Sequence, residues 1–202
     1  MVGYLDGKDD DLAEWAARAI SSFDEKILVP RMLFWMRDAE GKRLELVKET
    51  VEYGIRSSEH LLPFLKNPDE SVAKMALSLL PKNSTEEGVC EILPCLTDPK
   101  LRAEANPLIC ERLEPLCGEL RVPFERRGPL GQEVMAYSMS LEDVGDKWIL
   151  WRSFEILEAI LEQRLGERTK STARRVLSCL KEETGVRNAK EAWMRLMQEI
   201  KS

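Results

Sequence analysis

The sequence predicts an all-α protein built from short helical units that repeat along the chain. No stretch shows the sustained alternation of apolar and polar residues that marks a half-buried strand. The segment LLPFLKNP at residues 61–68 returns, altered, as ILPCLTDP at residues 92–99. Self-similarity at a period of roughly 20–50 residues is typical of stacked supersecondary units, each too small to bury its own apolar face.

Two helices are expected before this repeat. Three consecutive aspartates at residues 9–11 suit the N-terminal end of a helix, and apolar residues recur at helical spacing over residues 12–20. Ser22 and Glu25 have the spacing of a capping box, which predicts that a second helix begins there. Ser84 and Glu87 have the same spacing before the helix that carries Pro94.

A proline stands at the matching place in each unit. Pro63 and Pro94 are 31 residues apart, and Pro30 lies 33 residues before Pro63. Inside a helix, proline removes one backbone hydrogen bond and bends the rod. The three prolines therefore predict the same bent first helix in three successive units.

The pattern resembles the short form of the HEAT repeat. Each clear copy has Leu-Pro-x-Leu, then Asn or Asp with Pro, then an aliphatic residue four positions before an alanine. The family's basic residue after the aliphatic one is matched by Arg102, whereas Ala73 departs from it. The resemblance covers about residues 24–117 and implies an α-solenoid of about three helix pairs. It is carried by Leu62, Pro63, Leu65, Asn67, Pro68, Val72 and Ala76, and by Leu93, Pro94, Leu96, Asp98, Pro99, Leu101 and Ala105.

A boundary is expected after Gly118. Two prolines and two glycines fall within residues 122–131, which indicates a loop or linker. We therefore divide the chain into an N-terminal helix with repeats at 1–118, a linker at 119–139 and a C-terminal helical bundle at 140–202. The bundle should hold three helices: one over 140–165, a second that stops at Gly185, and a third capped by Asn188. We expect this bundle to cap the solenoid, because solenoids need polar terminal units.

Composition excludes some classes of protein. The net charge is −6, which disfavours a dedicated nucleic-acid coat. Residues 1–118 hold 22 acidic against 15 basic residues, whereas residues 163–187 hold seven basic against three acidic. No apolar run is long enough for a transmembrane helix, and the N-terminus lacks the features of a signal peptide. Together with an odd number of cysteines, this favours the cytoplasm.

No catalytic or metal site is predicted, and no cofactor. The cysteine pairs Cys90/Cys95 and Cys110/Cys117 are five and seven residues apart, unlike the two to four that zinc sites favour. We interpret them as core residues. His60 is the only histidine and falls on a polar stretch, so we expect a surface residue rather than a base. Phosphate-binding, dinucleotide-binding and nucleophile-elbow motifs are absent from the sequence.

Aromatic residues stand on the polar side of the helix expected over 140–165. Trp148 and Trp151 lie there beside Lys147 and Arg152. One interpretation is that the preceding linker folds over both rings. The other is an exposed anchor pair with Arg152, because Trp and Arg dominate the hot spots of protein interfaces.

A basic face is expected on the following helix. Lys170, Arg174 and Lys181 share one side of it, with Arg168 and Arg175 close by. Glu167, Glu182 and Glu183 on the same helix reduce the positive charge of this face. This face has three interpretations: a solvated surface, a site for an acidic partner, or a nucleic-acid site.

Stacked helix pairs would leave a concave groove lined by the second helix of each pair. The candidate residues of this groove are mixed in charge but lean acidic, which favours a basic peptide or protein surface as the partner. The function that fits best is a non-enzymatic interaction adaptor or scaffold that binds a protein partner. Nucleic-acid binding and a HEAT-like lyase-type enzyme are the alternatives that the resemblance implies. The groove candidates are Glu45, Lys48, Glu52, Lys74, Ser78, Glu104 and Glu111.

Overall fold

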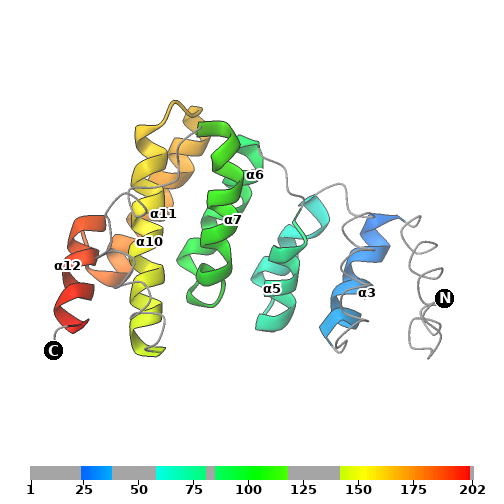
Figure 1. The fold of residues 1–202 in the computed structure, drawn as a ribbon. Helices are drawn as coiled ribbons and strands as arrows, with labels where there is room; N and C mark the ends of the chain where they lie inside the picture. The colour runs from blue at the N-terminus through cyan, green and yellow to red at the C-terminus, as the bar shows by residue number, and fades with distance from the viewer. Residues whose placement is uncertain (1–23, 38–57, 81–84, 118–141, 201–202) are drawn as a thin grey trace. The chain divides into compact units, whose positions relative to one another are not determined.

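The computed structural model describes residues 24–37, 58–80, 85–117 and 142–200, and these are helical, with no strand among them. The chain divides into two compact units, Met1–Pro81 and Lys82–Ser202. Figure 1 shows the helices of each unit. The described part of the chain is therefore all-α, as predicted, and none of its helices is long and apolar enough to cross a bilayer.

The described residues of the first unit form one long and one short α-helix with two 3-10 turns between them. These are α3 (Glu25–Arg37), η1 (Ser58–His60), η2 (Leu62–Lys66) and α5 (Glu70–Ser78). Helix α3 packs on α5 and on η1, and buries apolar side chains along one side. Ser22 lies outside the described residues; Asp24 accepts a hydrogen bond from the Lys26 N–H at 3.0 Å at the start of α3.

The other described helices belong to the second unit. They are α6 (Glu86–Ile92), η3 (Leu93–Thr97), α7 (Pro99–Cys117), α10 (Glu142–Glu162), α11 (Glu167–Thr184) and α12 (Ala189–Ile200). Helix α10 packs against α7, α11 and α12, while α11 also packs against α6 and η3. Apolar side chains of α10 account for these contacts, since Phe154, Ile156, Leu157 and Ile160 are all fully buried.

The two copies of the sequence repeat have the same local structure. We call η2 with α5 the first module and η3 with α7 the second module. In both, the proline is the second residue of a 3-10 helix, and the leucine two residues later, Leu65 or Leu96, is buried. Val72 and Leu101 are each the third residue of the following α-helix, and both are buried. The motif thus encodes one 3-10 turn followed by one α-helix.

Pro30 does not share this geometry. It lies inside α3, which remains α-helical from Glu25 to Arg37. In the second module the change from α6 to η3 falls at Leu93, directly before Pro94. Pro30 thus lies inside an α-helix, whereas Pro63 and Pro94 lie in 3-10 turns, and one bent first helix shared by three units stays a prediction.

The two modules differ in where the α-helix begins. In the first, Asn67 Oδ1 accepts the Asp69 N–H at 2.9 Å, and Asp69 Oδ1 accepts the Ser71 N–H at 3.0 Å. In the second, Asp98 caps α7 directly, accepting the Lys100 N–H at 3.0 Å. The first copy uses Asn67 and Asp69 where the second copy uses Asp98 alone. The first copy is therefore two residues longer at this point.

Helix ends in the second unit follow the sequence signals closely. Thr85, rather than the expected Ser84, caps α6 by accepting the Gly88 N–H at 3.1 Å. Gly185 ends α11 in the left-handed conformation with φ 65°, which favours glycine. Asn188 caps α12 by accepting the Glu191 N–H at 2.9 Å. The three predicted C-terminal helices are all observed.

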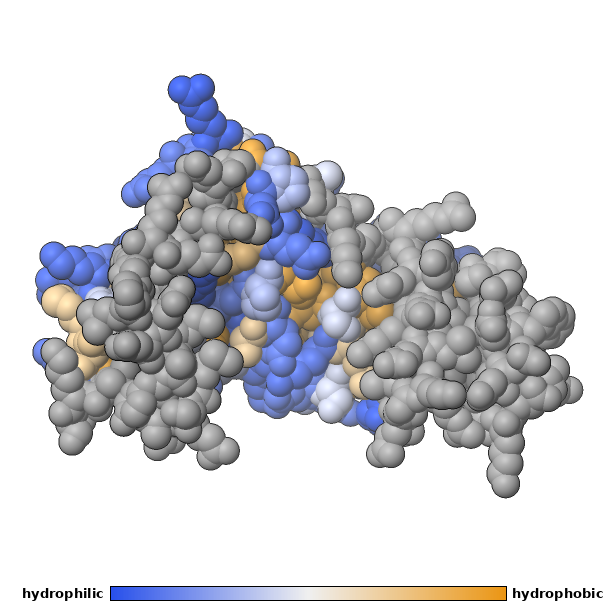
Figure 2. Space-filling model, viewed as in Figure 1, coloured by the Kyte–Doolittle hydropathy of each residue, from blue (hydrophilic) through white to orange (hydrophobic). Residues whose placement is uncertain are grey.

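The division into units does not follow the boundary expected after Gly118. The second module belongs to the same unit as α10, α11 and α12, and it is separated from the first module at Pro81/Lys82. The expected linker at 119–139 lies outside the described residues. On the face drawn in Figure 2, hydrophilic residues cover much of the described surface. The large apolar side chains that are exposed among the described residues are Ile27, Leu116 and Met194.

Candidate functional site

Two arginines of α7 are buried and bind backbone carbonyls. Arg102 Nε donates to the Leu96 carbonyl at 2.7 Å, and Arg112 Nη1 donates to the Gly88 carbonyl at 2.8 Å. Burial lowers the pKa of Arg102, while Glu183, whose carboxylate lies 3.6 Å from Nη2, acts in the opposite direction. Arg102 therefore joins α7 to η3, and Arg112 joins α7 to α6.

A polar contact joins α7 to α10. Asn106 Nδ2 donates to the Ile149 carbonyl at 3.0 Å, and the buried Ser153 hydroxyl lies 3.2 Å from Asn106 Oδ1. The same hydroxyl also lies 2.9 Å from the Ile149 carbonyl. Each buried polar atom of this contact is thus matched inside the protein, as a stable core requires.

The first turn of α11 receives its cap from a different helix. Its N-cap is Gly166, which has no side chain to offer. Glu86 Oε2 of α6 accepts from the Gly166 N–H at 2.7 Å and from the Thr169 hydroxyl at 2.9 Å. A carboxylate at this end is favoured by the helix dipole. A Cβ at position 166 would lie 2.8 Å from the same oxygen, so a larger residue there would require the Glu86 carboxylate to shift.

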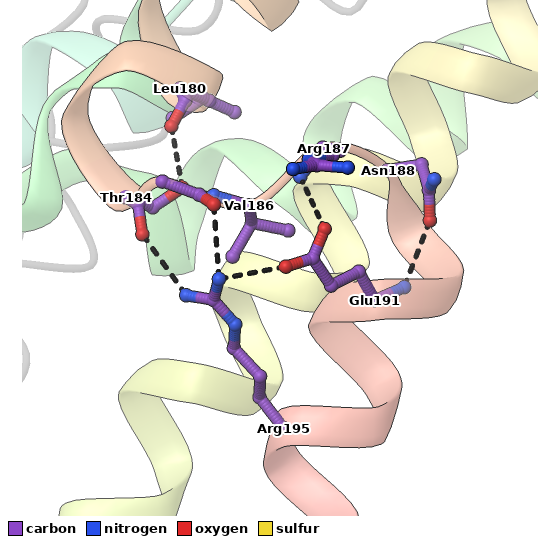
Figure 3. Close-up of polar contacts among 8 residues, drawn as sticks. Leu180, Thr184, Val186, Arg187, Asn188, Glu191 and Arg195 are labelled. Carbon is purple, nitrogen blue, oxygen red and sulfur yellow. Dashed lines mark hydrogen bonds and ion pairs between the residues drawn. The ribbon is translucent and has the colours of Figure 1, made fainter.

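The corner between α11 and α12 is closed by a second polar network (Figure 3). Arg195 donates to the Thr184 carbonyl at 3.2 Å and to the Gly185 carbonyl at 3.0 Å, and its Nη2 lies 2.7 Å from Glu191 Oε1. The other Glu191 oxygen accepts the Arg187 N–H at 3.0 Å. These bonds lower the pKa of Glu191, first through the Arg187 N–H and then through Arg195.

The tryptophans predicted as a possible anchor pair form a three-ring cluster instead. Ring centroids of Trp148 and Trp151 are 4.8 Å apart, and that of Trp193 on α12 lies 4.9 Å from Trp151. Trp151 is only 1% exposed, so its ring is not available as a surface anchor. Trp148 is half-buried. Among the described residues, α12 supplies a ring that packs on Trp151, which neither interpretation from sequence had named; the linker of the first interpretation lies outside the described residues.

Arg152 is held between α10 and α7. Its Nη1 lies 2.9 Å from Glu155 Oε2, and its Nη2 lies 3.9 Å from Cys110 Sγ. Burial raises the pKa of the Cys110 thiol, and Arg152 partly offsets that rise. Arg152 is thus engaged within the unit and contributes little to a surface for partners.

The predicted basic face lies on α11, where Arg174 and Lys181 are exposed and Lys170 is half-buried. Arg174 is paired with Glu167, and the neighbouring Arg168 lies 3.0 Å from Glu87. The side chains of Lys170, Arg175 and Lys181 form no hydrogen bond or ion pair with any described residue. The structure therefore brings the basic residues of this face together and leaves three of them without an intramolecular partner in the described part.

The groove candidates are spread over both units. Lys74 lies 3.0 Å from Glu70, and the Ser78 hydroxyl donates to the Met75 carbonyl at 2.9 Å, both within α5. On α7, Glu111 is exposed and Glu104 half-buried. Glu45, Lys48 and Glu52 lie outside the described residues. A common groove for all of them stays a prediction.

Two of the described cysteines support the interpretation of the cysteines as core residues. Cys90 and Cys95 are buried, whereas Cys179 is exposed and Cys110 half-buried. Burial raises the pKa of the Cys95 thiol to about 12. Among the described residues, no three His, Cys, Asp or Glu side chains are placed to hold a metal ion. His60 is half-buried in η1.

Sequence reasoning missed the contacts between α6 and α11. Glu86 and Gly166 are 80 residues apart, and nothing in either local sequence indicates the other. The one available signal was that a helix start at Gly166 lacks a capping side chain of its own, which calls for a cap from elsewhere.

No family model matches this chain, and comparisons with curated proteins and with solved structures give no significant match either.

Proposed function

We propose that this protein is a non-enzymatic adaptor or scaffold that binds protein partners through the concave surface lined by the second helix of each HEAT-like helix pair. One observation carries the proposal: two copies of one sequence motif have the same 3-10 turn, the same buried leucine and the same following helix. Repetition of a single supersecondary unit is the design by which solenoids build extended binding surfaces.

The surface proposed for binding includes the solvent-exposed positions of the second helix in each pair. On α7 the exposed residues fall on one arc that includes Glu111, and Glu104 is half-buried beside it. This surface is acidic on α7, which suits a basic peptide or protein. A preformed helical surface binds with little loss of its own conformational freedom. In this proposal the protein acts in the cytoplasm, as its odd number of cysteines favours.

Affinity capture from a lysate of the source organism tests the proposal. We would compare low salt with about 0.5 M salt, and nuclease-treated with untreated lysate, because phosphate contacts weaken steeply with ionic strength. A specific protein that is retained after nuclease treatment is expected. Retention of nucleic acid alone, lost at high salt, would instead favour the nucleic-acid alternative.

A matched pair of charge reversals locates the surface. Glu111→Lys changes the proposed face of α7, whereas Glu162→Lys makes the same change at an exposed position at the end of α10. We expect the first variant to retain less of the captured partner and the second to retain as much as wild type. Equal retention by both variants would exclude the α7 face.

A further inference from the structure

Helix α11 presents two rows of cations on either side of a line of small side chains. At about 100° per residue, Lys170, Arg174 and Lys181 fall within about 40° of one another, and Arg168 and Arg175 form a second row about 130° away. Ser171 and Ser178 lie between the rows, and Glu182 lies at the C-terminal end of the same line, its Oε1 3.4 Å from the Ser178 hydroxyl. Both serines are exposed, as are four of the five basic residues. We call these five basic residues the cationic face and the two serines the serine strip.

The rest of α11 is fixed within the second unit, so this face is rigid. Thr169, Ala173, Val176, Leu177 and Leu180 are buried on the opposite side of the helix. One end of α11 is held by Glu86 and the other by Arg195, as described above. A face on a helix held at both ends loses little conformational freedom when a partner binds.

We infer that the cationic face binds an acidic helical segment of a partner protein, which lies along the serine strip with carboxylates on both of its edges. The inference rests on the proposed adaptor function and names the class of partner for one surface. Short side chains on the contact line allow two helix axes to approach closely. Charge complementarity on both sides then orients the segment.

The length of the face fits a short protein segment better than a nucleic acid. Arg168 and Lys181 are 13 residues apart, or about 20 Å along the helix axis. Glu167 lies before the face, and Glu182 and Glu183 lie beyond it. A phosphate backbone continues past both ends and would meet these carboxylates, whereas an acidic segment of about four turns ends with the face.

The five basic residues of the cationic face differ in whether a carboxylate of this chain is already paired with them. Arg168 lies against Glu87 and Arg174 against Glu167, in pairs that are largely exposed to solvent. Lys170, Arg175 and Lys181 have no such partner among the described residues. We therefore expect Lys170 and Lys181 to contribute more to binding than Arg168 does.

A defined peptide tests the inference with the purified full chain. The probe is a fluorescent synthetic helix with alanine on its contact line and glutamate on both edges, and its control is a peptide of the same composition in scrambled order. Fluorescence anisotropy at low salt should give a Kd for the first that is at least about 10-fold lower than for the second. Equal binding of both peptides would overturn the inference, because it would show attraction by net charge alone.

Two variants separate charge from shape. Lys170→Glu with Lys181→Glu should raise the Kd about 10-fold or more, since exposed ion pairs each contribute a few-fold and reversal adds repulsion. The control, Lys100→Glu with Lys190→Glu, makes the same charge change at exposed positions in the first turns of α7 and α12. Ser178→Trp should also raise the Kd without changing charge. Wild-type affinity in Ser178→Trp, or equal losses in both lysine pairs, would overturn the inference.

A single-stranded oligonucleotide of similar length is the competing probe. Tighter binding of the oligonucleotide than of the acidic helix would overturn the inference in favour of a nucleic acid. The outcome is separable from that of the adaptor proposal. If the partner captured from lysate is retained equally by the variant Lys170→Glu with Lys181→Glu, and the peptide does not bind, the cationic face fails while the adaptor function stands.

Discussion

The first and second modules share one local structure but have different packing partners. Both place a proline in a 3-10 turn, a buried leucine two residues later and an aspartate as the cap of the following helix. The second module is further held by buried Arg102, by Asn106 and by contacts with α10 and α11. The first has Ala73 where the second has Arg102.

This difference shows which part of a repeat is set locally. The turn and the helix start recur because their bonds join residues two to four positions apart. Among the described residues, the buried contacts that Asn106 makes with Ile149 and Ser153 occur in the second module alone, because they need partners from a helix far along the chain. Local structure and tertiary anchoring are therefore separable in this protein, and the following predictions test that separation.

The largest effect is expected from the buried leucines. Leu96 is fully buried and Leu65 is 8% exposed, so both alanine variants should lower the free energy of unfolding by about 2–5 kcal/mol, with Leu96→Ala the more severe. Denaturant unfolding followed by circular dichroism measures both. A loss below about 0.5 kcal/mol for either would mean that its leucine is not part of a core.

The next effect comes from Arg102. Replacing it by methionine leaves the Leu96 carbonyl without its donor, which should reduce the free energy of unfolding by about 1–3 kcal/mol. Glu183→Gln serves as the control: it removes only the half-exposed partner at 3.6 Å and should cost less than about 1 kcal/mol. An Arg102→Met variant as stable as wild type would show that this anchor is dispensable.

The caps should give smaller and similar losses. Asp98→Ala and Asp69→Ala each remove an N-cap, which typically costs about 1 kcal/mol. Asn67→Ala should also destabilise, because the first module uses Asn67 to bind the Asp69 N–H. Thermal unfolding of the three variants compares them. If Asn67→Ala is neutral while Asp69→Ala is not, the extra cap residue has no energetic role.

The smallest effect depends on pH and concerns Cys95, whose place in the first module is taken by Phe64. Because the folded thiol has a pKa of about 12 against an ordinary 9.0, the unfolded chain loses this proton first as pH rises. The stabilising contribution is full below pH 9 and is lost between pH 9 and 12, by about 1 kcal/mol at pH 10. Cys95→Ala should show a weaker loss of stability from pH 8 to pH 10 than wild type.

The exposed Cys179 provides the control for that experiment. Cys179→Ala should keep the wild-type pH dependence, and in wild type Cys179 should react with a thiol reagent long before Cys95 does. A Cys95 that reacts as fast as Cys179 would contradict the burial of its side chain.

The sequence was sufficient for most helices and for their ends. Gly185 and Asn188 are signals that act through their own backbone or the next turn, and α11 and α12 end and begin where these residues predict. Leu65 and Leu96, which hold the same place in the two copies of the motif, are both buried. The separation of the modules into two units could not be predicted, because it depends on how strongly α10 and α11 pack on the second copy.

The candidate site was harder to predict for the same reason. Helical spacing was enough to place Lys170, Arg174 and Lys181 on one face. It could not show that Trp151 is covered by Trp193, because a periodic pattern identifies the side of a helix but not its neighbour. The cap that Glu86 gives to α11 was missed because it joins two distant segments.

The tryptophan cluster gives the protein an internal optical probe. Three of its five tryptophans, Trp148, Trp151 and Trp193, lie where α10 meets α12 in the second unit, and the other two, Trp15 and Trp35, belong to the first unit. Intrinsic fluorescence should therefore follow the opening of α12 from α10 more strongly than it follows the first module, whereas circular dichroism follows all helices alike. Unfolding curves from the two signals that do not coincide would reveal that the units open one after the other.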